Sequence, residues 1–386
     1  MKRVLVPGVL IFFVATLCGS FANAATQFPG AGEAADFQEG RRLFERERFG
    51  GNGRTCSTCH SKDTGTVSPA DAQRRFQSNP ADPLFLHDGS DDGLGNGVAR
   101  MLERATVLIS IPLPANVTLA DDPAATHVVL RRGIATTLNS PALDPVIMLD
   151  GRQPTLPAQA MGAITDHAQS TATPAQLNLI AKFQTSQLFF TSTALAAFAR
   201  GGPAPQLPLG NTPSEKRGRR FFDDVGPDFA AGLKPGLCSH CHSGPLLNQT
   251  NEFADDFILL PIPAGQRFLS VGVSEFNTAG NPVREFIFNA GSDDEFHLFS
   301  PDPGRALQTG IGNPALDPTL ANVNAFKISP LRGIRHTAPY FHDNSAATLD
   351  DVAAHYANFF FIVTGGLIQL TEEDQRDLVA YMKLLD

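Results

Sequence analysis

The sequence contains no tryptophan, so no electron or hole relay in this protein can run through an indole side chain. Positive charge is also in short supply: 30 lysines and arginines stand against 39 aspartates and glutamates, which gives a formal net charge of −9. A chain this acidic repels the phosphate backbone of nucleic acids. No nucleic acid is therefore expected as a partner, and a basic redox protein would suit the surface better.

The apolar run near the N-terminus, from Val4 to Cys18, is shorter than the roughly 20 residues that a membrane-spanning helix needs. Two basic residues precede it and the small residues of Phe21-Ala-Asn-Ala24 follow it, which predicts a cleaved signal peptide over residues 1 to 24. An uncleaved anchor and a lipoprotein modified at Cys18 are the alternatives, but Ala-Thr-Leu before Cys18 lacks the usual small residue. We expect soluble export without stable membrane insertion.

Cysteine is scarce, and the four cysteines that follow the signal peptide all lie in two motifs, Cys56-Ser-Thr-Cys59-His60 and Cys238-Ser-His-Cys241-His242. Cys-x-x-Cys-His is the attachment signature of c-type haem. The two thiols bond the vinyl groups of the porphyrin, and the adjacent histidine then falls beneath the iron as proximal ligand. The sequence predicts two covalently bound haems with His60 and His242 as proximal ligands, and it leaves no cysteine for disulfides.

Two other kinds of site use the same cysteine spacing, a thioredoxin-like redox pair and a zinc site. Neither explains why a histidine directly follows both cysteine pairs. Haem is joined to such motifs outside the cytoplasm, which agrees with a periplasmic destination. Removal of the signal peptide takes away two basic residues and brings the formal charge from −9 to −11.

The two motifs belong to an internal repeat. Gly-Arg-Arg followed by two apolar residues precedes each of them, within Phe37 to Phe44 and within Ser214 to Phe222, and both segments are predicted to be short helices. About 360 residues remain after cleavage, enough for two domains. The segment from Gly201 to Pro213 is rich in helix breakers. We therefore predict an N-terminal domain over residues 25–205 and a C-terminal domain over residues 206–386.

The rest of the chain predicts a mainly α fold of two cytochrome c-like domains, with short helices and long loops. Thr371 starts a C-terminal stretch in which Leu378, Tyr381, Met382 and Leu385 share one helical face. Small cytochromes often close with such a helix against the haem. Segments such as Glu285-Phe-Ile-Phe288 predict a few short strands within residues 248–325.

Together with two further stretches, these features resemble the bacterial di-haem cytochrome c peroxidase and MauG superfamily. One stretch runs from Thr137 to Arg152, with Asp-Gly-Arg at its end, and continues into Leu156-Pro-Ala-Gln159. The other runs from Phe326 to Tyr356 and includes Arg-His-Thr-Ala-Pro-Tyr-Phe-His. The resemblance spans nearly the whole mature chain. It implies that an N-terminal haem activates peroxide while a C-terminal haem relays electrons.

The resemblance also implies a second ligand for the C-terminal haem. Its position is methionine in the peroxidases and tyrosine in MauG, and here it is Tyr356, with His355 as the alternative. None of the five methionines lies between Thr337 and Tyr356, which argues against methionine ligation. Tyrosinate is an anionic oxygen donor that favours ferric iron. Tyr340, His342 and His336 are expected to hold their loop by hydrogen bonds instead.

At the N-terminal haem the family uses a glutamine and a glutamate after Asp-Gly-Arg to move a proton between the oxygens of peroxide. Gln159 matches the glutamine, but Gln169 stands at the glutamate position, and an amide cannot act as a general base. Asp166 or His167 would then supply the proton chemistry, or His167 would ligate the iron. His127 is another potential ligand. His87 and His297 have no motif around them and are expected at the surface.

Between the haems the family places a tryptophan before Asp-Gly-Arg, and here that residue is Leu149. Leucine has no accessible redox state, so direct tunnelling or another group must carry the electron. The family also often holds calcium with backbone oxygens of a Thr-x-Pro segment, which Thr337 and Pro339 match, but the assisting asparagine is replaced near Gly133. Carbonyls and water remain available to such a cation.

The leading hypothesis is a periplasmic di-haem oxidoreductase that reacts with hydrogen peroxide at the His60 haem and exchanges electrons through the His242 haem. Its partner would be a small redox protein, a cytochrome or cupredoxin, or an oxidisable protein or organic substrate. Tyr356 favours MauG-like oxidation, whereas Leu149 and Gln169 oppose it. The rival hypothesis is a non-catalytic electron carrier or redox sensor on the same scaffold, with both irons six-coordinate and His127 or His167 capping the first.

Overall fold

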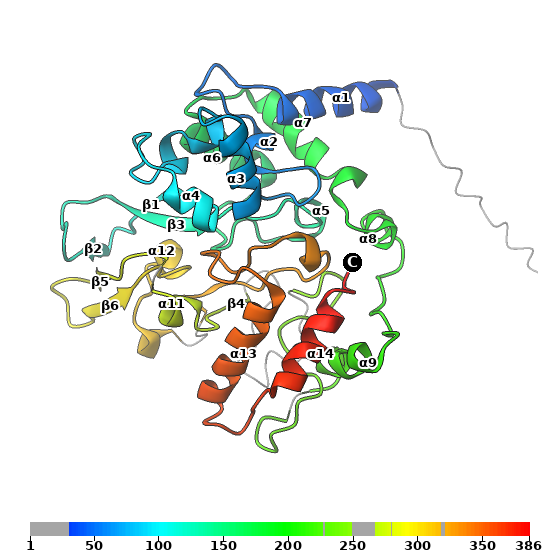
Figure 1. The fold of residues 1–386 in the computed structure, drawn as a ribbon. Helices are drawn as coiled ribbons and strands as arrows, with labels where there is room; N and C mark the ends of the chain where they lie inside the picture. The colour runs from blue at the N-terminus through cyan, green and yellow to red at the C-terminus, as the bar shows by residue number, and fades with distance from the viewer. Residues whose placement is uncertain (1–30, 227, 249–266, 279, 318–320) are drawn as a thin grey trace, which may run out of the picture.

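A computed structural model describes residues 31–226, 228–248, 267–278, 280–317 and 321–386 (Figure 1). The predicted signal peptide and Cys18 lie outside these ranges. The helices up to residue 205 are α1 (Ala31–Glu45), α2 (Cys56–Cys59), α3 (Pro69–Ser78), α4 (Ala99–Arg104), α5 (Ser140–Leu143), α6 (Leu156–Ala168), α7 (Pro174–Gln184) and α8 (Thr193–Phe198). Those after it are α9 (Pro213–Arg219), α11 (Val273–Phe276), α12 (Ala306–Thr309), α13 (Leu349–Val363) and α14 (Glu372–Met382). The fold is mainly α, as predicted, with long connecting loops.

The internal repeat appears in space as two matching helix pairs, in which α1 packs against α7 and α9 packs against α14 (Figure 1). The repeated glycine makes each pair possible. A Cβ at Gly40 would lie 2.4 Å from the carbonyl oxygen of Leu179 on α7, and one at Gly218 would lie 2.0 Å from that of Asp377 on α14. Real Cβ atoms do not approach so closely, so only glycine lets these helix backbones touch. The two short helices predicted before the motifs are confirmed.

The predicted C-terminal helix is also confirmed. The hydroxyl of Thr371 accepts a hydrogen bond from the Asp374 amide, and the Asp374 carboxylate accepts one from the Thr371 amide, so a capping box starts α14. Its apolar face is buried, with Tyr381 and Leu385 fully enclosed and Met382 nearly so. This helix therefore closes the core of the second half against α9 and α13.

The strands are more widespread than the sequence predicts. Those at β4 (Phe268–Leu269), β5 (Arg284–Phe288) and β6 (Phe296–Ser300) fall in the expected region. An antiparallel hairpin of β1 (Thr106–Pro112) and β3 (His127–Gly133), and the short strands β2 (Val117–Leu119) and β7 (Phe326–Lys327), lie outside it. The burial of β1 and β3 alternates along each strand, but each strand contains three consecutive apolar residues, so the sequence itself does not show this period-2 pattern.

The two halves share one sheet and part of one core. Strand β2 pairs with β5, which pairs with β6, so the sheet order β2-β5-β6 crosses the predicted boundary at residue 205. Phe286 and Phe288 on β5 are fully buried in the cluster around β1 and β3. The division into residues 25–205 and 206–386 stays a prediction, but packing alone does not separate the halves. Among the described helices, none has both the length and the apolar character needed to cross a bilayer.

Candidate haem sites

Both motif histidines are held in the same way. The Nδ1 atom of His60 lies 2.8 Å from the carbonyl oxygen of Gly65, and that of His242 lies 2.8 Å from the carbonyl oxygen of Leu247. A carbonyl oxygen only accepts, so Nδ1 carries the proton in each ring and Nε2 is left with the lone pair. Burial lowers the pKa of His60 and brings the pKa of His242 to about 4, which keeps both rings neutral and able to bind iron.

Each motif opens onto its own pocket. Cys59 and His60 line the first pocket, while Cys56, one turn earlier on α2, packs against the adjoining cluster around Phe44. Cys238, Cys241 and His242 line the second pocket, whose wall is mostly apolar. An apolar cavity with two thiols and a neutral imidazole at one edge fits a covalently attached porphyrin. The donor sets at both sites therefore suit c-type haem.

The other two readings of the cysteine spacing fit the structure poorly. A reactive Cys-x-x-Cys pair needs a lowered thiol pKa, but burial raises the pKa values of Cys56 and Cys241 to about 12, and those of Cys59 and Cys238 are raised as well. A zinc site needs converging ligands. Over the residues that the structure describes, no three His, Cys, Asp or Glu side chains come together as they would around a metal ion.

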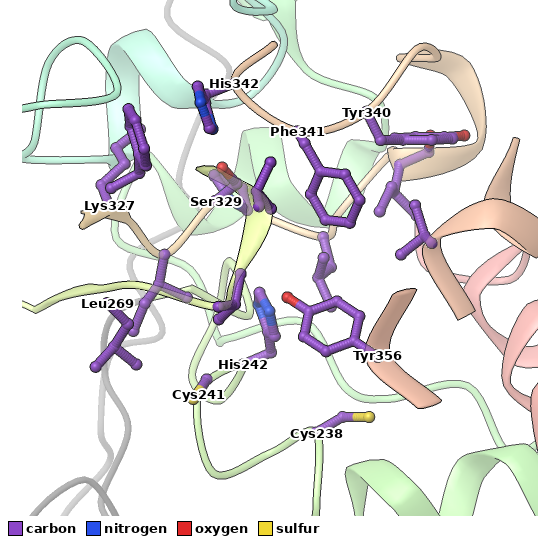
Figure 2. Close-up of a pocket in the computed structure, with 18 of the residues that line it drawn as sticks. Cys238, Cys241, His242, Leu269, Lys327, Ser329, Tyr340, Phe341, His342 and Tyr356 are labelled. Carbon is purple, nitrogen blue, oxygen red and sulfur yellow. The ribbon is translucent and has the colours of Figure 1, made fainter. Parts of the chain in front are cut away.

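Helix α13 decides what faces His242 in the second pocket. Val352, Tyr356 and Phe360 recur every four residues on its pocket face. Figure 2 shows the Tyr356 side chain extending into the pocket, with its hydroxyl directed toward the His242 ring. Burial raises the pKa of this phenol, and among the described residues its oxygen has no hydrogen-bond partner. Tyr356 is thus placed where the sequence predicts the iron ligand.

The alternative ligand, His355, points elsewhere. His355 directly precedes Tyr356 on α13. Because successive residues of a helix are rotated by about 100°, its side chain points away from the pocket face. Its Nε2 atom lies 2.8 Å from the carbonyl oxygen of Val271, and its ring packs at 4.6 Å from the Phe341 ring. His355 does not line the second pocket, so the structure favours Tyr356 of the two.

The other side chains of this loop have the expected structural contacts. The Tyr340 hydroxyl donates to the carbonyl oxygen of Ile334 at 3.1 Å, and the His342 ring stacks on Phe326 with 3.8 Å between centroids. His336 accepts from Arg335 at the surface. Tyr340 and His336 thus make the expected kind of hydrogen bond, whereas His342 is held by stacking; Tyr340 and His342 also line the second pocket.

Sequence reasoning did not consider Met382 as a possible ligand in the second pocket. Met382 on α14 also lines it, although it lies outside the segment in which a methionine ligand was sought. Met382 belongs to the apolar helical face that was predicted to cover the haem, so the helical period of the sequence already indicated that it lies near this pocket. Met382 is a necessary control in any test of Tyr356.

Helix α6 forms the matching wall of the first pocket. Gln159, Ala163 and His167 recur every four residues and all three face the pocket. The Nδ1 atom of His167 is bonded to the Asp88 carboxylate, which leaves Nε2 as the ring nitrogen available to the pocket. An amide and an imidazole therefore stand together on one wall, as an acid–base site requires.

A buried arginine completes this arrangement. Arg54 is 2% exposed, pairs with Asp88 and donates to the carbonyl oxygens of Pro83 at 2.8 Å and His167 at 3.1 Å. Burial opposes the ionisation of Asp88, but the hydrogen bond and charge of His167 and the charge of Arg54 still lower its pKa. Asp88 therefore stays anionic and orients His167. Neither Arg54 nor Asp88 lies in a recognised motif, so neither could be predicted from the sequence.

The structure does not bring Gln169 to this wall. Gln169 ends α6 in the left-handed conformation (φ 55°), and its exposed amide lies 3.3 Å from His87 Nδ1. The turn at the helix end carries its side chain off the pocket face. The expectation that Gln169 acts in the pocket is therefore corrected. The groups available in place of the family's glutamate are His167 and its partner Asp88.

The remaining candidate ligands of the first haem also lie elsewhere. His127 begins β3 in an exposed position beside Thr126 and does not line the pocket. Asp166 points outward from α6. His297 is at the surface, as expected, between Glu285 and Glu295. His167 is thus the one predicted alternative ligand that the described structure places at the first pocket.

One stretch of wall separates the two pockets. Leu149 and Lys327 line both, and the Lys327 amide donates to the Leu149 carbonyl oxygen at 2.8 Å. Leu149, which stands at the position of the family's bridging tryptophan, therefore lies between the two pockets. Lys327 was not recognised from the sequence, because β7 is only two residues long and carries no motif.

The proposed calcium segment lies close to this wall. Thr337 and Pro339 line the second pocket, and the Gly133 amide donates to the carbonyl oxygen of His342 at 2.7 Å. A Cβ at Gly133 would lie 2.1 Å from Asn344 Oδ1. The Asn344 side chain thus takes the space that a side chain at residue 133 would need.

Comparisons with known proteins agree with the motifs. No protein-family model matches the chain. A cytochrome c peroxidase of Denitromonas iodatirespirans is 28% identical over 160 residues, 38% of this chain and 36% of the relative. A cytochrome c551 peroxidase of Nitrosomonas europaea is 41% identical over 69 residues, 17% of this chain and 18% of the relative. The chain thus matches about a third and a fifth of the length of these relatives.

Solved structures give a weaker likeness. A MauG-like protein associated with microbial copper homeostasis aligns with 91% of this chain and 88% of its own, at 19% identity and a TM-score of 0.49. The di-haem peroxidase BthA of Burkholderia thailandensis aligns with 93% of this chain and 86% of its own, at 16% identity and a TM-score of 0.45. The two sequence matches are both to cytochrome c peroxidases, which agrees with the resemblance to that family.

Proposed function

We propose that this chain is a periplasmic di-haem c-type cytochrome with peroxide chemistry at the first site and electron transfer through the second. Cys56, Cys59 and His60 would hold one haem, and Cys238, Cys241 and His242 the other. The observation that carries the proposal is the contrast between the two walls opposite these motifs. The first presents an amide and an imidazole backed by Asp88, and the second presents a tyrosine.

A haem held by His60 would supply the iron chemistry with peroxide. The chain would supply the proton chemistry, since cleavage of the O–O bond requires one oxygen to leave as water. His167 would accept a proton from peroxide at Nε2 and deliver it to the oxygen that leaves. Asp88 holds the ring and stabilises its charged form, while the Gln159 amide donates a hydrogen bond. His167 with Asp88 thus replaces the glutamate of the family.

At the second site Tyr356 would provide an anionic oxygen ligand, which lowers the reduction potential and favours oxidised iron. This supports MauG-like oxidation of a protein or organic substrate. One relative is named a cytochrome c551 peroxidase, which supports a small cytochrome as electron donor, and a cupredoxin is the comparable alternative. The acidic surface suits a basic partner.

The enzyme proposal is tested by peroxide turnover of the haem-loaded protein with a reduced small cytochrome, a cupredoxin or an organic donor. Turnover that disappears in His167→Gln but persists in Gln169→Ala is the expected result. No turnover with any of these donors contradicts the proposal.

A non-catalytic carrier or sensor is the second candidate, and one observation favours it. The Nε2 atom of His167, which suits proton transfer, is equally a ligand for iron. Electron paramagnetic resonance of the oxidised protein separates the two. A high-spin ferric signal indicates an open first site, whereas two low-spin signals that change in His167→Gln indicate a capped one.

Calcium between the halves is a further part of the proposal. Backbone oxygens of the Thr337 to Pro339 segment would contribute, with water and other carbonyls completing the shell. Chelation followed by metal analysis tests it, and protein that contains no calcium after purification in calcium-supplemented buffer contradicts it.

A further inference from the structure

The wall shared by the two pockets contains one charged side chain, that of Lys327. The residues common to both linings are Gly133, Ile134, Ala135, Thr136, Ser140, Leu149 and Lys327. In the second pocket Lys327 is also the only Lys, Arg, Asp or Glu side chain that the described residues contribute. From residue 31 onward, the positions outside the described ranges include no lysine or arginine in the sequence. Lys327 therefore has no substitute as a cation at this pocket.

The ammonium group of Lys327 is half-buried and makes two hydrogen bonds. Its side chain is 11% exposed, and Nζ donates to Asp144 Oδ2 at 2.8 Å and to the carbonyl oxygen of Val146 at 2.7 Å. An ammonium has three N–H donors. Among the described residues the third has no acceptor, and a buried N–H without a partner is costly. Within the described ranges the third N–H is therefore left facing the pockets, where an anion or a carbonyl would satisfy it.

Porphyrin chemistry supplies such an anion on this side. The vinyl groups that bond the cysteines and the two propionates lie on opposite edges of the ring. In the second pocket, Figure 2 shows Lys327 across the cavity from Cys238. A haem bonded at the cysteines would direct its propionate edge away from them, toward the shared wall. Carboxylate and ammonium form a charge-assisted hydrogen bond, which is stronger than a neutral one.

We propose that Lys327 binds a haem propionate with its third N–H and acts as a positive charge common to both haems. This rests on the proposal that both pockets hold haem, but it does not depend on peroxide turnover. A nearby positive charge opposes the oxidised form of iron, which carries the greater positive charge, and so raises the reduction potential. Because Lys327 lines both pockets, removal of its charge lowers both potentials.

Asp144 gives the matching variant of opposite sign. It lines the first pocket but not the second, and it keeps two other donors: the Val146 amide at 2.9 Å and Asn248 Nδ2 at 3.2 Å. Asp144→Asn thus removes a negative charge from the wall of one pocket. We expect the potential of the first haem to rise, and to rise more than that of the second.

The experiment is a spectroelectrochemical titration of the haem-loaded protein and its variants. Lys327→Gln keeps a donor for Asp144 and Val146 while removing the charge, and is expected to shift both midpoint potentials downward. Lys327→Arg keeps the charge and should restore both. Lys182→Met removes a surface lysine paired with Asp36 at 2.8 Å, and should leave both unchanged because water screens its charge.

If Lys327 and Asp144 form only a structural ion pair, Lys327→Gln and Asp144→Asn would disturb the same packing. Both substitutions would then shift the potentials in the same direction. That outcome overturns the proposal, as does a Lys327→Gln protein in which one potential or neither moves. Haem content is measured in each variant by the pyridine haemochrome spectrum. Shifted potentials in a protein without peroxide turnover would reject the proposed peroxidase activity and retain the role of Lys327.

Discussion

The two pockets are alike on the side of the motif and unlike on the side that faces it. His60 and His242 have the same Nδ1 bond to a carbonyl oxygen five residues later, at the same 2.8 Å. Opposite them, α6 presents Gln159 and His167, whereas α13 presents Tyr356 among apolar side chains. Repetition thus fixes haem attachment, and the facing helix sets the chemistry.

The largest expected effect is the removal of one attachment motif. Cys56→Ala with Cys59→Ala should leave a protein with only the second haem and no peroxide reaction, because the thioether bonds are lost. The matched variant Cys238→Ala with Cys241→Ala should retain the first haem but lose turnover with external donors. Haem content and single-turnover reaction with peroxide measure both. Peroxide reactivity that follows the second motif would reverse the assignment of the two pockets.

The next effect concerns the polar wall. His167→Gln should reduce peroxide turnover by about 10²- to 10⁴-fold, the usual contribution of a general acid–base. Asp88→Asn should cause a smaller loss, because the imidazole remains but loses its orienting anion. Steady-state kinetics measure both, with haem content as the control. If His167 instead caps the iron, His167→Gln would raise peroxide reactivity, which would contradict the proposed role.

A buried ion cluster between the pockets is expected to control stability. Arg132 pairs with Asp150 on the loop before α6 and, at 2.7 Å, with Asp302 from the second half, and all three are buried. Asp302→Asn should lower the free energy of unfolding by about 3–5 kcal/mol, as for other broken buried pairs. Denaturant unfolding of the haem-loaded protein measures it. A loss near zero would show that the halves do not depend on this contact.

The same cluster predicts a pH dependence. Burial opposes the ionisation of Asp150, yet the charges of Arg132 and Arg152 lower its pKa below the usual value. A depressed carboxyl pKa contributes stability above the unfolded pKa of about 3.9, and this contribution is lost as the pH falls through the folded value. Unfolding between pH 6 and pH 3 (roughly the window set by that unfolded pKa) should therefore show decreasing stability, and Asp150→Asn should flatten this dependence.

A spectroscopic change confined to one haem would sharpen the comparison further. Tyr356→Phe should alter the absorption and electron paramagnetic resonance signals of the second haem and leave those of the first unchanged. Met382→Leu is the control, because Met382 lines the same pocket and contains the competing donor. An unchanged spectrum in Tyr356→Phe, or the same change in Met382→Leu, would exclude tyrosine ligation.

The smallest effect is expected at Gln169. Its side chain is exposed and lies beside His87, off the pocket wall. Gln169→Ala should change peroxide turnover by less than about 2-fold, because a surface amide contributes little to proton transfer in a pocket. Gln159→Ala, on the pocket wall, is the contrast and should reduce turnover measurably. Equal effects of the two substitutions would contradict the distinction.

Several features of the site could be predicted from local sequence. The motifs locate both proximal histidines, and the helical period of α14 predicts its buried face. Tyr356 follows from its place in a stretch that resembles the superfamily. The hairpin of β1 and β3 was missed because the apolar residues of each strand are consecutive and do not alternate with polar ones. These signals succeed because the residues involved are close in sequence.

The sequence by itself determined the two Cys-x-x-Cys-His motifs, because each holds its thiols and imidazole within five consecutive residues. Tertiary structure decided the rest of each site. Asp88 meets His167 across 79 residues, Lys327 meets Asp144 across 183, and a left-handed turn removes Gln169 from the pocket. Such contacts join segments that are distant along the chain, and their geometry exists only once the helices and strands have packed together.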